Sequence, residues 1–493
     1  MKNKNQLSIL NKGAISVYIL MVASISVTIL TSLAIFVASS QRNSSNEVSR
    51  QKALQFAEEG VYYYRWYLAH VLDGKNQQQI KDFWENGSPI GIDSSYNKVV
   101  TNFDSEVVGE FEINVTPPAT DSTIVIVEAT GWTYRHPHIK KKIRVRFRKP
   151  SWSEYSILAN DIMRFGEGTN VFGPVHSNNG IRFDGVANNV VTSAVTEYWD
   201  PDTSSTRDGV WTSQPNESEV FLAGKEYPVH SIDFNSVTSD LNLIETEAQQ
   251  NGLYFDDDVY QETVCNWFWG GWPPPMWEWD CILDDRSVLG YHFILRVDDK
   301  VEVRRVLDYQ GDQANETDTY RILEETASEV FSFPVNGLIF ADKNIWVDGQ
   351  INSARLTIVS ADLNGSTDTD IYISNDISYT NYNGDDIIGL IAENDISVGL
   401  YSEDHLNIDA ALLAQKGRVG RNWYSWFWGS WTQRAEITIR GSIATNQRYG
   451  FAWTDGTGYN DRNLYFDNNL IYYPPPYFPT GTVYELDLWE DVK

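Results

Sequence analysis

The chain opens with a long apolar segment that continues into an amphipathic one. Residues 14–38 carry no charged side chain and follow three lysines, and no other segment is apolar for long enough to span a bilayer. Beyond Ser40, apolar and small residues recur at spacings of three to five along residues 48–64, which predicts that the helix continues. We therefore expect one helix over residues 14–72, with a membrane-spanning half and an amphipathic half.

The basic flank predicts an N-terminus in the cytoplasm, with the chain after Arg42 outside the inner membrane. Three interpretations of the apolar segment are open. It is a secretory signal cut near Ser39, a plain membrane anchor, or a helix retained after a leader of residues 1–13 is cut between Gly13 and Ala14. The helical pattern beyond Ser40 favours the third interpretation, because a filament subunit needs an apolar half for packing and an amphipathic half that docks a globular head.

The next region, residues 73–150, predicts a small α+β head. Its strand-like stretches, residues 109–115, 123–131 and 138–149, read as three antiparallel strands. In the last of them, Ile143, Val145 and Phe147 face one way. The residues that face the other way are all basic: Lys142, Arg144, Arg146 and Arg148. This stripe is either a solvated edge face or a site for anionic glycans, lipid headgroups or an acidic neighbour.

A degenerate repeat begins near Tyr155. Each unit has a short apolar strand, a small residue, a turn with Asn or Asp, and a second alternating strand; the units are residues 158–166, 176–185, 340–349, 373–379, 391–399 and 413–420. Such a unit cannot bury its own apolar face, so the repeat predicts a β-solenoid of stacked coils. An antiparallel β-sandwich with many short strands is the alternative. The first coils would occupy residues 151–199, and the remaining coils with a C-terminal tail residues 332–493.

Residues 200–331 interrupt the repeat and predict a loop-rich insertion with a helix near residues 233–251. The two cysteines of the chain, Cys265 and Cys281, lie in this insertion. In an oxidising compartment we expect them to form a disulfide, which would stabilise the fold by about 3 kcal/mol. Two free thiols are the alternative.

Tryptophan is concentrated in two related motifs, at residues 267–272 and 426–431, each of which reads Trp-Phe-Trp-Gly-Xaa-Trp. The dense indoles around a glycine predict two hairpins with cross-strand packing. These hairpins either pack on each other, or they offer aromatic platforms for sugar rings, a membrane or a partner. The candidate binding residues are Trp267, Trp269, Trp272, Trp277, Trp279, Trp426, Trp428 and Trp431.

The N-terminal stretches KGAISVYIL (12–20) and ALQFAEEGVYYYRW (53–66) resemble the N-termini of PilX-type minor pilins and PulK-type pseudopilins. The resemblance covers about the first 70 residues. It implies cleavage after Gly13, a mature N-terminus at Ala14, and partners that are other pilins or pseudopilins. Tyr18 stands where major pilins carry a glutamate, which fits a minor subunit and puts bulk polymerisation in doubt.

The formal net charge of −29 argues against a nucleic-acid partner and suits a soluble extracellular surface. The seven histidines are scattered without metal-ligand spacing or a nucleophile motif, so we expect no enzyme activity, no metal and no cofactor. The sequence thus predicts a mainly β, minor pilin-like surface protein. It would start in the inner membrane, enter or cap a type IV pilus or pseudopilus, and display the solenoid for attachment, with a surface glycan as a further partner. The alternative is a membrane-anchored solenoid enzyme that acts on surface polysaccharide.

Overall fold

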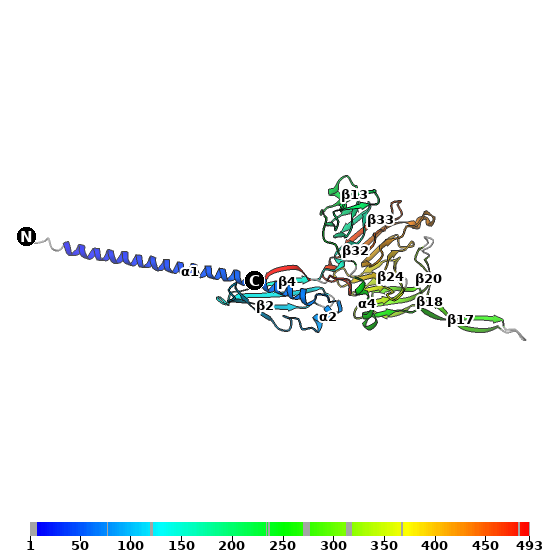
Figure 1. The fold of residues 1–493 in the computed structure, drawn as a ribbon, viewed down its shortest axis with the longest axis horizontal. Helices are drawn as coiled ribbons and strands as arrows, with labels where there is room; N and C mark the ends of the chain where they lie inside the picture. Colours follow the sequence, from blue (N-terminus) through cyan, green and yellow to red (C-terminus); the bar gives the residue numbers. More distant parts are fainter. Residues whose placement is uncertain are drawn as a thin grey trace, which may run out of the picture.

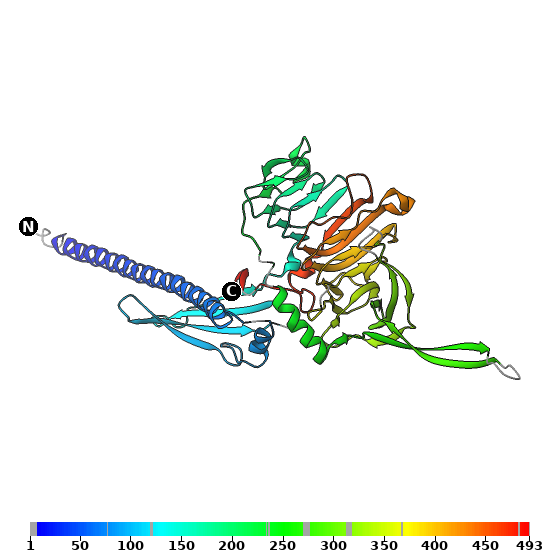
Figure 2. The same ribbon diagram turned by 45° about the vertical axis from the view of Figure 1, so that its right-hand side comes forward.

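The computed structural model describes most of the chain, namely residues 7–75, 77–118, 122–232, 234, 237–269, 277–311, 318–365, 368–481 and 484–492. The protein is mainly β, with one long N-terminal helix (Figure 1). The helix leads into a small head, and a larger body of stacked strands follows (Figure 2).

The head is an antiparallel sheet covered by the second half of helix α1 (Leu7–Val71). Its five strands pair in the order β1 (Tyr96–Thr101), β2 (Val107–Thr116), β3 (Ile124–Thr133), β4 (Lys140–Arg148) and β34 (Glu485–Val492). A short helix, α2 (Gln77–Glu85), follows α1. Burial alternates along β2 and β3, so every second side chain enters the core with the buried face of α1.

Two strands of the head were not among the three predicted ones. β1 pairs with β2, and β34 returns from the C-terminus to pair with β4. The tail of the predicted unit 332–493 therefore ends on the head. No local pattern marks this pairing, because its two strands lie more than 300 residues apart in the sequence.

One parallel ladder of strands runs through the whole body. Its strands, in spatial order, are β16 (Leu253–Phe255), β23 (Leu338–Ala341), β25 (Arg355–Ser360), β28 (Ile387–Ala392), β30 (His405–Ala414), β32 (Gln433–Thr445), β5 (Ile157–Ala159), β8 (Val175–Ser177), β11 (Val191–Ser193) and β15 (Lys225–Glu226). All of these pairs are parallel, unlike those of the antiparallel sandwich considered as the alternative.

The order of the ladder differs from the order of the sequence. The chain joins the ladder in its middle at β5 and reaches one end at β15. It then crosses to the other end, where β16 begins the long return to β32, and β32 pairs with β5. Helix α4 (Val237–Asn251) lies on this crossing, within the segment 233–251 where a helix was predicted. The predicted insertion 200–331 thus contributes β15 and β16, as well as the crossing, to the stacked sheet.

The ladder strands are buried on both faces. Ile339, Ile358 and Leu390 point into the main core of the body. Their neighbours Phe340, Val359 and Ile391 pack on the other side with Leu241 and Ile244 of α4. Burial on two faces explains why β23 and β28, which read LIFA and IIGLIA, are continuous apolar runs instead of alternating.

Carboxylates at the turns satisfy backbone N–H groups of the next layer. Asp370 Oδ1 accepts from the N–H of Asp395 at 2.9 Å, and Asp395 Oδ1 accepts from the N–H of Arg418 at 2.7 Å. These contacts give the Asn and Asp residues of the repeat a structural role at the corners.

His292 in β19 (Gly290–Arg296) is held between two carboxylates. Its Nδ1 lies 3.0 Å from Glu325 Oε2 and its Nε2 lies 3.3 Å from Asp348 Oδ2. Burial lowers the pKa of His292, but the hydrogen bonds to Asp348 and Glu325 outweigh it and raise the pKa to about 9. Burial raises the pKa values of Asp348 and Glu325, but hydrogen bonds outweigh it and lower both pKa values. The donors are His292 and Asn375 at Asp348, and His292 and Arg304 at Glu325.

We therefore expect His292 to stabilise the body in a defined pH window. Because the pKa of His292 is higher in the folded protein, the charged imidazole contributes to the free energy of unfolding. This contribution is complete below the pKa of the unfolded chain, about 6.5, and is lost as the pH rises through the folded pKa of about 9. Compared with His292→Gln, the wild-type chain should lose on the order of 2–3 kcal/mol of unfolding free energy between pH 6 and pH 10. Urea unfolding at both pH values measures this loss. His405→Gln, at an exposed histidine, is the control, and a parallel pH dependence of the wild type and His292→Gln would contradict the expectation.

Candidate functional site

Helix α1 changes character along its length. From Ile15 to Val37 its large apolar side chains are 46–70% exposed. Within the described part of the chain, α1 alone is long and apolar enough to cross a membrane. Farther along, one face of α1 is buried against the head; its residues are Ser49, Ala53, Phe56, Ala57, Gly60, Val61, Tyr64 and Leu68. One helix thus combines an exposed apolar half, which we call the rod, with a docked amphipathic half.

Glycines let the backbones of helix and sheet meet. A Cβ at Gly131 in β3 would lie 2.3 Å from the Ala53 carbonyl oxygen and 2.5 Å from the Ala57 nitrogen. A Cβ at Gly60 of the helix would lie 3.1 Å from the ring of Phe111. The amphipathic half of α1 is therefore seated directly on the sheet, which fixes the direction of the whole helix relative to the head.

The predicted processing residues, Gly13 and Ala14, belong to the helical backbone of α1. Their surroundings are outside what the structure describes, and cleavage between them stays a prediction.

The basic stripe of β4 meets acidic groups of the same chain. Arg144 pairs with Glu128 at 2.6 Å, and Arg146 pairs with Asp487 at 2.5 Å. Lys142 also pairs with Glu128, and Arg148 pairs with Glu154. The prediction that β4 is an edge strand was wrong, because β34 pairs with β4 and brings Asp487 to it. The side chains of Lys142 and Arg144 are nevertheless 38% and 48% exposed. The acidic partners of the stripe come from three places in the same chain: Glu128 of β3, Glu154, and Asp487 of β34.

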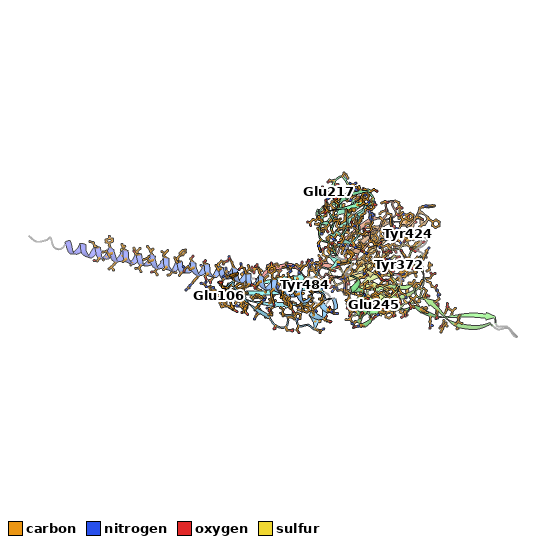
Figure 3. All side chains as sticks on the ribbon, in the orientation of Figure 1. Glu106, Glu217, Glu245, Tyr372, Tyr424 and Tyr484 are labelled. Carbon is orange, nitrogen blue, oxygen red and sulfur yellow. A yellow bond between two sulfur atoms is a disulfide. The ribbon has the colours of Figure 1, made fainter. Side chains whose placement is uncertain are left out.

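A neck of two chain segments connects the head to the body. The N–H of Trp152 donates to the Pro479 carbonyl at 3.2 Å, and the N–H of Gly481 donates to the Pro150 carbonyl at 2.7 Å. On the head side, Trp84 Nε1 donates to the Tyr484 hydroxyl at 3.0 Å. Figure 3 labels Tyr484 on the head and Tyr424 on the body. The chain therefore enters and leaves the body at one place.

Cys265 and Cys281 lie opposite each other in the hairpin of β17 (Val259–Trp269) and β18 (Trp277–Ser287) and form a disulfide. Figures 1 and 2 show this hairpin extending away from the stacked strands. The register sets Trp267 opposite Trp279 and Trp269 opposite Trp277. The side chains of these four residues, and all of Trp272, lie outside the described part of the chain.

The second tryptophan motif was predicted as a hairpin, and this was wrong. Residues Trp426–Thr432 form a 3-10 segment, η3, that is broken at Gly429, whose φ is 62°. Trp431 packs edge-on against Tyr401 at 5.0 Å and lies under the guanidinium of Arg434 at 4.4 Å. Trp428 contacts Tyr401 at 6.4 Å, whereas Trp426 is 86% exposed.

Buried Arg421 gives the physical reason for this conformation. Its guanidinium donates to the carbonyls of Leu400, Trp431 and Thr432 at 2.8–3.1 Å. The backbone carbonyls at the end of the motif therefore accept hydrogen bonds from a buried side chain. They are not available to pair with a second strand of a hairpin. The sequence around Arg421 does not indicate that this arginine is buried, because arginine side chains are mostly exposed. The conformation of η3 could therefore not be predicted from the sequence.

Among the residues that the structure describes, no group of three or more His, Cys, Asp or Glu side chains is arranged to hold a metal ion. The absence of a cofactor remains an expectation.

The chain matches no family model and no curated protein. Among solved structures, it is similar to the competence-associated pilin ComZ from Thermus thermophilus, with 12% identity over 90% of this chain and 98% of that chain. The TM-score of this comparison is 0.29, too low to support an argument about fold or function.

We expect a side chain at Gly131 to loosen the amphipathic half of α1 from the head. Gly131→Ala should cost about 1–3 kcal/mol of unfolding free energy, because its Cβ would overlap the α1 backbone. Hydrogen exchange of the α1 amides around Ala53 and Ala57 measures the loss directly. Gly481→Ala is the matched control, since its nearest new contact is 3.5 Å away. Equal protection of α1 in both variants would contradict the role assigned to Gly131.

Proposed function

We propose that the protein is a minor pilin-like subunit that enters or caps a type IV pilus or pseudopilus and displays its body at the cell surface. The observation that carries this proposal is the continuity of α1, whose exposed apolar half passes directly into the half packed on the head. The resemblance of residues 12–20 and 53–66 to PilX-type minor pilins and PulK-type pseudopilins supports the same role.

The exposed half of α1 requires an apolar partner. A continuous row of large apolar side chains is unstable in water, since each one gains about 1.5–3 kcal/mol on burial. The uncharged residues 14–38 form about 37 Å of helix, enough to cross a hydrocarbon core of about 30 Å. The inner membrane before assembly, and the helices of other pilins afterwards, are the partners that this surface suits.

We infer that the body is a β-solenoid. The parallel ladder and the turn carboxylates that bond to the next layer support stacked coils. Because the neck joins the stack in its middle, both ends of the stack are left to project from the head.

We propose a structural role rather than catalysis. Three carboxylates that are largely buried, Asp370, Asp395 and Asp409, are used as hydrogen-bond acceptors for backbone N–H groups. Attachment is the activity that best suits the exposed aromatic residues of η3, where Trp426 is 86% and Phe427 is 77% exposed.

The mature N-terminus tests the filament role. Mass spectrometry of the protein purified from its membranes should give a chain that starts at Ala14. Gly13→Val should block this cut and remove the protein from sheared surface filaments, because the resemblance assigns Gly13 to the leader peptidase. Ala38→Val is the matched control, since it also replaces a small residue by valine but lies within the retained helix. A chain that starts near Ser39, or that keeps Met1 in the wild type, would contradict the proposal.

A further inference from the structure

A groove of about 840 Å³ lies where the last strands of the chain meet the first ones. One wall comes from β6 (Met163–Phe165), β9 (Ile181–Phe183) and the turn at Asp202. The other comes from the connection between β32 and β33 (Gly458–Phe466). We call it the seam groove, and its volume lies within the range of roughly 300–1,000 Å³ found for ligand pockets. Figure 2 shows the early strands, in cyan and green, beside the late strands, in orange and red.

The seam groove concentrates arginines in a strongly acidic protein. Five line it: Arg164, Arg182, Arg418, Arg448 and Arg462. Four carboxylates line it as well: Asp161, Glu167, Asp184 and Asp202. This balance contrasts with the rest of a chain whose net charge is −29. Both signs of charge are therefore present in the groove, and its arginines can attract anions that a uniformly acidic surface would repel.

Some of this positive charge is not neutralised within the groove. Asp202 accepts from both Arg164 at 2.8 Å and Arg448 at 3.2 Å, so two guanidinium groups share one carboxylate. Arg418 donates instead to the Arg421 carbonyl and to Asn422 Oδ1, at 3.2 and 2.7 Å. Within the described part of the chain, Arg418 forms no ion pair with a carboxylate. Arg418 and Arg448 thus keep capacity for a further anionic oxygen.

An aromatic face stands beside these arginines. Trp453 lines the seam groove, is 39% exposed, and lies under the guanidinium of Arg418 at 5.7 Å. Its turn is fixed, because the N–H of Trp453 donates to the Thr457 carbonyl at 2.9 Å and Asp455 accepts from Trp423 Nε1 at 2.7 Å. A positioned indole next to a guanidinium is preorganised for a flat, partly apolar ligand that carries negative charge.

We propose that the seam groove binds an acidic polysaccharide, with a uronate carboxylate on Arg418 and Arg448 and a sugar ring against Trp453. The groove carboxylates favour this ligand over a polynucleotide. They accept hydrogen bonds from sugar hydroxyls, whereas they repel a chain with a phosphate at every residue. The inference goes beyond the filament role, since it requires only the body of the protein.

The test uses the full chain in detergent micelles, with a hyaluronan octasaccharide as the probe and calorimetry at 50 mM salt. This probe carries one carboxylate on every second ring, and its methyl ester keeps the rings without the charge. We expect the ester to bind at least about tenfold more weakly, as for the loss of a charge-assisted hydrogen bond. Arg448→Gln and Trp453→Ala should each weaken binding of the probe by about tenfold.

Matched controls lie outside the seam groove. Arg296→Gln removes an exposed arginine of β19, and Trp199→Ala removes an exposed tryptophan of β12 (Glu197–Asp200). Both variants should bind the probe as the wild type does. Arg448→Gln leaves Asp202 paired with Arg164, so the fold should be retained, and the melting temperature checks this. The comparison with the ester uses the wild-type chain, so it decides the question even if a variant unfolds.

Several outcomes would overturn the inference. They are equal binding of the probe and its ester, unchanged affinity in both groove variants, no binding of the probe, or tighter binding of a 12-nucleotide single-stranded DNA. None of these bears on the filament role, which the N-terminus of the mature chain tests by itself.

Discussion

The pairing of β32 with β5 is the contact on which the rest of the body depends. It joins residues 443–445 to residues 157–159, and so places the end of the stacked chain against its beginning. The chain can then enter and leave the body side by side, which makes the two-segment neck possible. The same junction creates the seam groove, whose walls come from opposite ends of the sequence. The parallel pairing of β33 with residues 169–172 reinforces this junction, so two neighbouring strand pairs join the late half of the stack to the early half.

The head and the neck use the C-terminus in two ways. β34 supplies the fifth strand of the sheet, and its Asp487 pairs with Arg146 and Arg148 of the basic stripe. The residues just before β34 bond to Pro150 and Trp152 and form half of the neck. Arg148 connects the two parts, since it pairs both with Glu154 at the start of the body and with Asp487 of β34. The orientation of the body is thus fixed by charge pairs and backbone hydrogen bonds together.

The sequence predicted the elements whose causes are local. The long helix followed from apolar spacing, and β2, β3 and β4 from alternation. The two apolar faces of β23 and β28 are visible in the sequence as continuous apolar runs. The position of β34, the crossing through α4 and the junction of β32 with β5 were not predictable, because these contacts join residues far apart in the sequence. The shape of η3 depends on buried Arg421, and the pairing of the groove arginines depends on which strands become neighbours.

The neck also determines how the protein would carry tension. Figure 1 shows β4 along the long axis of the molecule, with the rod at one end and the body at the other. A pull on the body reaches the head through the end of β4 and the start of β34, so two covalent connections share it. From β4 the force passes to β3 along a ladder of nine residue pairs parallel to the pull. Those hydrogen bonds resist in shear and must break together, so the antiparallel sheet acts as a mechanical clamp between the rod and the body.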